Sequence, residues 1–261
     1  MNGAPRRVLF TRAPRPGGPE ERVLAAAGCA ALSVPVLRFE PGGELARLGP
    51  RLREAPPLDL VLVTSRHAAE ALARVLRGLS PAARPRCAAV GDATARPLRE
   101  AGVEVDVPPA SDRSRTGAAA LAAHVLKRLA NGSRVLFARG NLSLEVLPGA
   151  LRARGVEVEE LEVYRTTAAA PEVAGVLEAL EQGRVAAAVF TSPSGVEALH
   201  SLVPAEAWDR LMELPAVAPG DATAGALLEA GARRIERAAE AGEGGIAAAL
   251  AHALLPRAKD P

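Results

Sequence analysis

Small polar side chains recur in this sequence directly after runs of apolar residues. At the start of a helix, hydroxyl, glycine and amide groups of this kind accompany free backbone N–H donors and the positive end of the helix dipole, which together favour an anion. We expect an anion-binding site built from Thr11, Arg12, Thr64, Ser65, Gly91, Asp92, Thr94, Arg139, Gly140, Asn141, Thr191, Ser192, Ser194, Gly220, Asp221 and Thr223.

A structural explanation competes with this one for the hydroxyl residues. Ser, Thr and Asp between a strand and a helix are common N-caps, which stabilise a helix by about 1 kcal/mol without any ligand. Arg12 and Arg139 have no capping role, so each either binds an anion or forms a structural ion pair. Tyr164, the single tyrosine, follows the β-rich segment 156–163 and is either a hydrogen-bond donor or general acid in a cleft, or the aromatic end of a strand.

The sequence lacks the signatures of several familiar enzyme classes. There is no GxSxG elbow, no GxxxxGK[ST] phosphate loop and no GxGxxG motif. No two histidines have the i, i+4 spacing that aims two imidazoles at one metal, since they stand at His67, His124, His200 and His252. These patterns disfavour nucleotide hydrolysis, acyl transfer and metal catalysis, and we expect no metal and no disulfide between Cys29 and Cys87.

Composition and charge narrow the class of protein. The 261 residues are 49% hydrophobic but only 2% aromatic, which favours a Leu, Val and Ala core of helices packed on parallel strands. The 32 basic residues nearly balance the 30 acidic ones, so nucleic acid is not an expected partner. Without a visible signal peptide or an apolar run long enough to span a membrane, we expect a cytoplasmic protein and no membrane partner.

The candidate residues follow an internal repeat. VLFTR at positions 8–12 returns as VLFAR at 135–139, and Thr64-Ser65 returns as Thr191-Ser192, both 127 residues later. GDATA at 91–95 returns 129 residues later, at 220–224. Three segments in one order at nearly one offset indicate a duplication.

Each repeated segment predicts a strand, a loop and then a helix. The continuous apolar runs 60–63 and 187–190 are typical of central parallel strands covered on both faces. Glycines such as Gly28 and Gly102 are expected to end helices, with strands such as 33–37 following them. The sequence therefore predicts two doubly wound, flavodoxin- or Rossmann-like α/β domains, whose ligands bind beyond the carboxyl ends of the strands.

Where the chain passes between domains is less evident. The stretch 41–43 with Pro50 beyond it, and the stretch 166–171, are rich in helix-breaking or small residues and are predicted linkers. Either the chain crosses at both places, so that each domain mixes the two copies, or the halves divide near Gly132. The residues alone leave both possibilities open.

The order and spacing of these segments resemble the uroporphyrinogen-III synthase family across nearly the whole chain. The matching pieces are Thr11-Arg12, 60–72, 90–95, 137–148, 163–166, 190–195 and 220–224. Pro219 departs from the family, which usually has an aliphatic residue there. The resemblance implies two similar α/β domains, one of residues 1–36 and 167–261 and one of 40–163, joined by a two-stranded β linker at 37–39 and 164–166.

The resemblance also implies an activity. Members of the family are lyases of haem biosynthesis that need no cofactor. They close hydroxymethylbilane, a linear tetrapyrrole with eight carboxylates, with loss of water and inversion of the last pyrrole ring, giving uroporphyrinogen III. Tyr164 matches a cleft tyrosine that assists departure of the hydroxyl, and Thr64, Thr94, Ser192 and Thr223 match cleft hydroxyls.

We expect a monomer, the default state for a hinged two-domain enzyme, and the resemblance suggests a transient contact with hydroxymethylbilane synthase. A second hypothesis keeps the architecture without the reaction. In it the chain is a non-enzymatic, two-domain regulatory protein that binds an anion or a tetrapyrrole. Turnover of the tetrapyrrole distinguishes the two.

Overall fold

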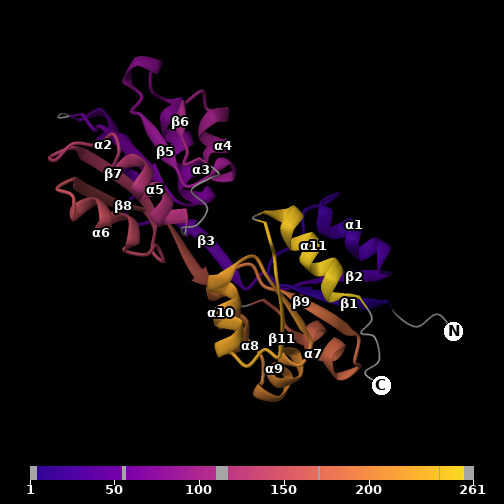
Figure 1. The fold of residues 1–261 in the computed structure, drawn as a ribbon. Coiled ribbons are helices and arrows are strands. Elements are labelled where there is room, and N and C mark those ends of the chain that lie inside the picture. Colours follow the sequence, from indigo (N-terminus) through magenta and orange to yellow (C-terminus); the bar gives the residue numbers. More distant parts are fainter. Residues whose placement is uncertain (1–4, 55–56, 110–116, 170, 241, 256–261) are drawn as a thin grey trace. The chain divides into compact units, whose positions relative to one another are not determined.

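The computed structural model describes residues 5–54, 57–109, 117–169, 171–240 and 242–255. The chain forms two compact units (Figure 1). Unit 1 comprises residues 1–38 and 168–261, and unit 2 comprises residues 39–167. Within the described ranges, every helix is too short or too polar to cross a membrane.

Unit 1 contains a five-stranded parallel sheet with the order β11-β10-β9-β1-β2. Its strands are β1 (Arg6–Phe10), β2 (Cys29–Ser33), β9 (Val185–Val189), β10 (Pro215–Ala218) and β11 (Arg234–Arg237). Its helices are α1 (Pro19–Ala26), α7 (Ala174–Glu181), α8 (Pro193–Leu202), α9 (Ala205–Met212), α10 (Asp221–Glu229) and α11 (Glu243–Ala253).

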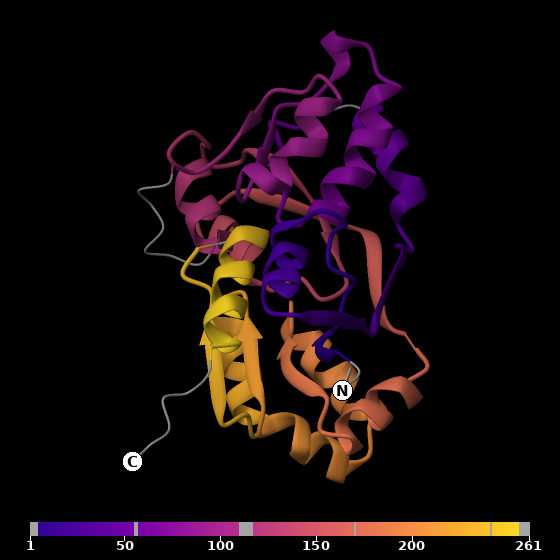
Figure 2. The ribbon, with the colours of Figure 1, turned by 90° about the vertical axis from the view of Figure 1, so that its right-hand side faces the viewer.

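Helices cover both faces of this sheet. Val8 and Phe10 of β1 pack with α1 and α11, which lie side by side in Figure 2. Leu9, between them, points to the other face and joins the core formed with α7, α8, α9 and α10. Alternate residues of one apolar strand therefore build two cores, as a doubly wound sheet requires.

Unit 2 contains a six-stranded sheet with the order β3-β8-β7-β4-β5-β6. Its strands are β3 (Leu37–Pro41), β4 (Leu60–Val63), β5 (Cys87–Ala89), β6 (Val105–Asp106), β7 (Arg134–Gly140) and β8 (Glu157–Ala168). Its helices are α2 (Leu45–Arg53), α3 (Arg66–Arg77), α4 (Asp92–Glu100), α5 (Gly117–Val125) and α6 (Val146–Arg152), with a short 3₁₀ turn at Pro81–Ala83. Val61 and Val63 pack toward α2, α3 and α4, whereas Leu60 and Leu62 pack toward α5 and α6.

Strands β3 and β8 carry the chain from one unit to the other. The N–H of Gly42 donates to the Val163 carbonyl at 3.1 Å, and the N–H of Ala169 donates to the Val36 carbonyl at 2.8 Å. Partner numbers rise along one strand as they fall along the other, so this two-stranded connection is antiparallel. The α/β class and the parallel sheets were predicted from the sequence and are confirmed. Strands β3 and β8 include residues 37–39 and 164–166, which the resemblance assigned to the linker.

The two sheets place the repeated segments in the same positions. Strands are counted here from the one that precedes the Thr-Ser pair, which is β4 in unit 2 and β9 in unit 1. In unit 1 the count continues after β11 with the N-terminal strands β1 and β2. Each sheet then has the order third, second, first, fourth, fifth: β6-β5-β4-β7-β8 in unit 2 and β11-β10-β9-β1-β2 in unit 1. The VLF-containing strands, β7 and β1, are fourth in both sheets. This shared order supports the internal duplication.

Three local predictions were wrong. The strand expected at 33–37 is β2 at Cys29–Ser33, because pairing with β1 begins at Cys29. Pro50 lies inside α2, whose apolar Leu48 is fully buried and whose Arg51 pairs with Glu159, so packing outweighs the proline there. Tyr164 lies within β8 rather than at the end of a strand.

Candidate functional site

In unit 2, several of the predicted residues lie at the topological switch point of the sheet, where the connections from two neighbouring strands lead in opposite directions. Strands β4 and β7 are neighbours, with Val63 opposite Ala138, but the chain leaves β4 toward β5 and leaves β7 toward β8. Such a switch point is the usual ligand site of an open parallel sheet. Thr64 and Ser65 follow β4 directly, and Gly140 ends β7.

The helices that begin at this edge start in two different ways. Ser65 is the N-cap of α3, and its Oγ accepts a hydrogen bond from the N–H of Ala68 at 3.1 Å. Gly91 precedes α4 and provides no side-chain cap, and the carboxylate of Asp92 is drawn away to Arg99 at 2.7 Å. The first turn of α4 therefore keeps the donors that an anion would bind, with half-buried Thr94 beside them.

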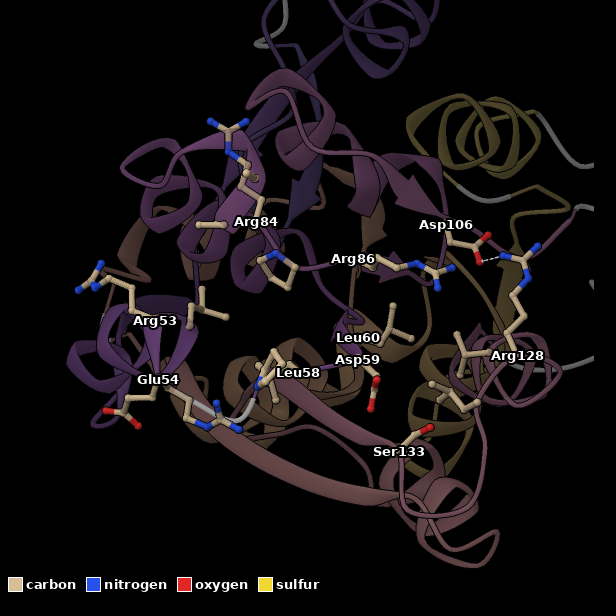
Figure 3. Close-up of a pocket in the computed structure, with 18 residues that line it drawn as sticks. Arg53, Glu54, Leu58, Asp59, Leu60, Arg84, Arg86, Asp106, Arg128 and Ser133 are labelled. Atoms are coloured by element: carbon tan, nitrogen blue, oxygen red, sulfur yellow. Dashed lines mark hydrogen bonds and ion pairs between the residues drawn. The ribbon is translucent and has the colours of Figure 1, made fainter.

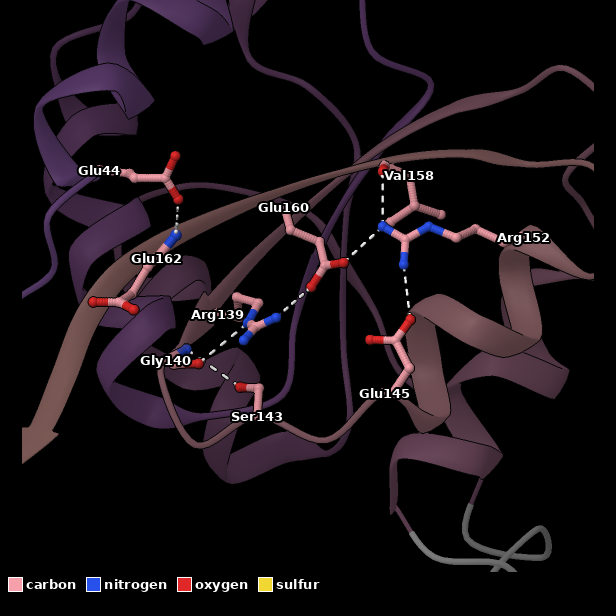
Figure 4. A network of polar contacts seen from close by, with 9 residues as sticks. All are labelled: Glu44, Arg139, Gly140, Ser143, Glu145, Arg152, Val158, Glu160 and Glu162. Atoms are coloured by element: carbon pink, nitrogen blue, oxygen red, sulfur yellow. Dashed lines mark hydrogen bonds and ion pairs between the residues drawn. The ribbon is translucent and has the colours of Figure 1, made fainter.

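Arg139 belongs to a network of ion pairs (Figure 4). Its Nη1 lies 2.6 Å from Glu160, which also pairs with Arg152 at 2.6 Å, and Arg152 pairs in turn with Glu145 at 2.8 Å. Of the two explanations open from the sequence, the structure shows the ion pair. A role for Arg139 in binding an anion stays a prediction.

Tyr164 lies against Gly140, its partner across the β7–β8 pair. A Cβ added at Gly140 would overlap the tyrosine ring, so glycine is what allows this approach. Asn141 holds the adjoining stretch of β8 through two hydrogen bonds with the Thr166 backbone, at 2.8 and 3.1 Å. Within the part of the chain that the structure describes, the half-buried Tyr164 makes no hydrogen bond through its hydroxyl.

Two aromatic residues beside Tyr164 were missed by the sequence analysis. Phe39 and His67 stack with ring centroids 3.8 Å apart, and the His67 ring centroid lies 5.5 Å from that of Tyr164. Residue 39 was assigned to a linker and His67 was counted only as a scattered histidine. The available signal was the place of His67, two residues after Ser65 at the predicted site.

The corresponding edge of unit 1 lies at the neighbouring strands β9 and β1, where Val189 is opposite Phe10. Thr11 is buried there, and its N–H donates to the Val189 carbonyl at 3.1 Å. Ser192 caps α8 by accepting from the N–H of Gly195 at 3.1 Å, and its Oγ lies 3.1 Å from Ser194 Oγ. Half-buried Thr191 directly precedes this cap.

Two further predicted regions of unit 1 differ in whether their hydrogen-bond donors already have a partner. Gly220 precedes α10 without a side-chain cap, and Asp221 turns outward to Arg237 at 2.8 Å, while Thr223 is 3% exposed. Arg12 instead pairs with Glu20, whose side chain is 1% exposed, through contacts of 2.5 and 3.2 Å. Like α4, α10 offers an uncapped first turn, whereas Arg12, like Arg139, is held in an ion pair.

A cavity of about 760 Å³ in unit 2 lies elsewhere (Figure 3). It opens at the amino-terminal ends of β4 and β7, beside Leu60 and Ser133, and none of the predicted site residues lines it. Its wall includes the ion pair of Asp106 with Arg128. We place the candidate site at the carboxyl edges instead, because the uncapped helix starts and Tyr164 lie there.

Cys87 and Asp106 are titratable groups outside this edge whose pKa values are shifted. Burial raises the pKa of the Cys87 thiol to about 12, and Cys29 is a second free thiol, only partly buried. Burial alone would raise the pKa of Asp106, but hydrogen bonding and charge from His124, with the charge of Arg128, lower it overall. Among the described residues, no cluster of three or more His, Cys, Asp or Glu side chains has the arrangement of a metal site.

Comparisons of the sequence with known proteins identify its relatives. Residues 20–248 match the family described as uroporphyrinogen-III synthase HemD. The uroporphyrinogen-III synthase of Salmonella typhimurium is 36% identical over 202 residues, which cover 76% of this chain and 80% of that protein. The Escherichia coli uroporphyrinogen-III synthase is 32% identical over 203 residues, with 76% and 80% covered.

Solved structures agree with this match. A crystal structure of a mutant uroporphyrinogen III synthase from Thermus thermophilus has a TM-score of 0.62 at 25% identity, covering 95% of this chain and 98% of that one. The Helicobacter pylori uroporphyrinogen-III synthetase shares the fold, with a TM-score of 0.60 at 18% identity and coverage of 96% and 100%. The family match spans well over half of the sequence, and this chain therefore belongs to the uroporphyrinogen-III synthase family.

Proposed function

We propose that this protein is a lyase that converts hydroxymethylbilane into uroporphyrinogen III in haem biosynthesis. The observation that supports this most directly is the pair of uncapped helix starts at Gly91 and Gly220, each at the carboxyl edge of a parallel sheet. Such starts bind carboxylates through backbone N–H groups. A substrate with eight carboxylates matches this chemistry.

The reaction removes one water and needs no external oxidant or reductant. The C–O bond of the hydroxymethyl group breaks, and the oxygen leaves as water after gaining a proton, which leaves an azafulvene. Attack by the last pyrrole ring forms a spiro intermediate, whose rearrangement closes the macrocycle with that ring inverted. The linear substrate also closes spontaneously to the uninverted isomer, so the protein must hold one folded conformer.

Tyr164 is the residue that we assign to the departing hydroxyl. Its phenol is half-buried, lies on Gly140 and is unpaired among the described residues, so it is available to donate a hydrogen bond to the leaving oxygen. Thr64, Thr94, Ser192 and Thr223 are assigned to binding, together with the helix starts beside them. Because binding is spread over many groups, no single substitution among them is expected to abolish turnover.

An isomer assay tests the proposed function. Hydroxymethylbilane is generated in situ with and without the purified protein, and the oxidised porphyrins are separated by chromatography. Isomer III in the presence of the protein establishes the activity. Isomer I alone, from protein shown to be folded, would contradict it and leave a binding protein. A cytoplasmic monomer that receives its substrate from hydroxymethylbilane synthase remains part of the proposal.

A further inference from the structure

Three rings meet at the carboxyl edge of the unit 2 sheet, each from a different element. Phe39 comes from β3, His67 from the first turn of α3 and Tyr164 from β8. The Phe39 and His67 rings are stacked, with centroids 3.8 Å apart and planes at 23°. Both lie near the Tyr164 ring, at centroid distances of 6.3 and 5.5 Å, with planes tilted by 47°.

Within this group, Phe39 is far more exposed than the other phenylalanines of the protein. Phe10, Phe137 and Phe190 are at most 1% exposed, whereas Phe39 is 49% exposed. Other exposed apolar side chains of unit 2 are Leu142 and Leu144 in the loop after β7 and Val146 at the start of α6. A large aromatic side chain gains little stability where half of its surface meets water, which indicates a role other than core packing.

His67 is suited to stacking because its imidazole favours the neutral form. Burial lowers its pKa, an effect that the charge of Glu70 opposes and the charge of Arg66 reinforces. A neutral imidazole presents an aromatic face without the cost of desolvating a cation. The stacked pair therefore extends the aromatic surface of Tyr164.

We propose that Phe39, His67 and Tyr164 form one aromatic face that stacks on a pyrrole ring of the substrate and holds it beside the Tyr164 hydroxyl. This inference rests on the proposed function and adds the group that recognises the apolar ring, since the helix starts recognise only carboxylates. Aromatic side chains bind flat π-systems in offset or edge-to-face arrangements. The Tyr164 ring is tilted by 47° to the stacked pair, so the three rings present faces in two directions to a ligand.

Matched substitutions separate aromatic stacking from bulk and from fold stability. Phe39→Leu and His67→Gln remove the aromatic faces, whereas Phe39→Tyr keeps one. His200→Ala is the control, because His200 belongs to unit 1 and stacks there on Trp208, with centroids 4.5 Å apart. Melting temperatures of all four variants are measured beside the wild type.

Steady-state kinetics with isomer analysis is the first readout. We expect Phe39→Leu and His67→Gln each to raise KM about threefold to tenfold and to increase the share of isomer I, with kcat changed less than about twofold. His200→Ala should keep the wild-type KM, and Phe39→Tyr, which retains an aromatic ring at position 39, should raise KM less than Phe39→Leu does. Unchanged KM and isomer ratio in the first two variants, with wild-type protein producing isomer III, would overturn the aromatic face and leave the proposed function intact.

Binding of uroporphyrin III is the second readout and does not depend on turnover. Stacking on the aromatic face should perturb the porphyrin absorption band, and Phe39→Leu and His67→Gln should weaken this binding about threefold to tenfold relative to His200→Ala. If the wild type makes no isomer III but this difference is seen, the proposed function fails and the aromatic face stands. Equal affinity in all variants contradicts the face.

Discussion

Each unit has a carboxylate on the third strand of its sheet that pairs with a histidine, but the two pairs are buried to different extents. In unit 2, Asp106 of the third strand pairs with His124 at 2.8 Å, and in unit 1 Glu236 of the third strand pairs with His252 at 2.7 Å. The His124 side chain is 10% exposed, whereas that of His252 is 66% exposed. Shared chemistry therefore does not imply equal contributions to stability.

The arginines at matching positions of the repeat, Arg12 and Arg139, differ in the opposite direction, because the carboxylate partner is more deeply buried in unit 1. Arg12 of unit 1 pairs with Glu20, whose side chain is 1% exposed, and Glu20 has no second ion-pair partner among the described residues. Arg139 of unit 2 pairs with Glu160, which also pairs with Arg152. A third contrast concerns the residue that follows each arginine. Unit 2 has Gly140 beneath the Tyr164 ring, and the matching residue of unit 1 is Ala13. The comparison teaches that segments of similar sequence form ion pairs of different burial in the two units, and that in unit 2 the residue after the arginine also lies against the Tyr164 ring.

The largest effect is expected from removing the unit 1 arginine. Arg12→Ala leaves the buried Glu20 carboxylate unpaired and should lower the free energy of unfolding by about 3 kcal/mol or more. Arg139→Ala should cost less, because Glu160 keeps Arg152. Chemical denaturation of both variants measures this, and adding Glu20→Gln to Arg12→Ala should recover part of the loss. Equal losses in the two units would contradict the burial argument.

The next effect concerns turnover. Gly140→Ala places a Cβ where the Tyr164 ring lies, so the ring must move. We expect kcat to fall about tenfold or more, equivalent to about 1.4 kcal/mol of lost transition-state stabilisation. The matched reverse change, Ala13→Gly in unit 1, should alter kcat less than about twofold. A Gly140→Ala variant with wild-type kcat would show that the position of Tyr164 is unimportant.

A smaller effect is expected from the threonines of the two uncapped helices. Thr94→Ala combined with Thr223→Ala should raise KM about fivefold to tenfold, as expected for lost hydrogen bonds to a charged ligand. Among the single variants, Thr223→Ala should lower the melting temperature more, because Thr223 is buried and Thr94 is only half-buried. If the double variant lowered the melting temperature without changing KM, both threonines would be purely structural.

The smallest effect is pH-dependent. Burial alone would raise the pKa of Asp106 and of Glu236, but hydrogen bonds and charges lower both overall, from His124 and Arg128 on Asp106 and from His252 and Arg234 on Glu236. A lowered carboxylate pKa stabilises the fold above the unfolded values of 3.8 and 4.5, and this contribution is lost as the pH falls below them.

At pH 7, Asp106→Asn should therefore lower the melting temperature by about 3 °C. Glu236→Gln should lower it less, because His252 is more exposed. Both differences from the wild type should shrink as the pH falls through the lowered pKa values of the two carboxyl groups. Thermal unfolding between pH 3 and 7 measures this, and an equal effect of the two substitutions at pH 7 would remove burial as the cause.

Much of the fold could be predicted because its signals are local. Apolar runs such as Leu60–Val63 identify central strands, and glycines such as Gly28, with φ of +63°, end helices where a residue without Cβ is favoured. Pro50 misled the prediction, since a proline normally argues against a helix while the burial of Leu48 depends on partners far along the chain.

The candidate site was predicted in part for the same reason. Residues that follow apolar strands, such as Thr64 and Thr191, are visible in the sequence, and each sheet brings its own set to its carboxyl edge. The stacking of Phe39 on His67 beside Tyr164 was not visible, because the three residues are separated by up to 125 positions and no local pattern joins them.

The sequence by itself determined the repeated βα units, the class of sheet and the polar segments that end its strands, because each depends on neighbours within a few residues. Only the tertiary structure decided which arginines are held by Glu20 and Glu160, which helices keep uncapped starts and which aromatic rings lie beside Tyr164. Those outcomes depend on contacts between different strands, loops and helices, whose positions are set by the packing of both sheet faces.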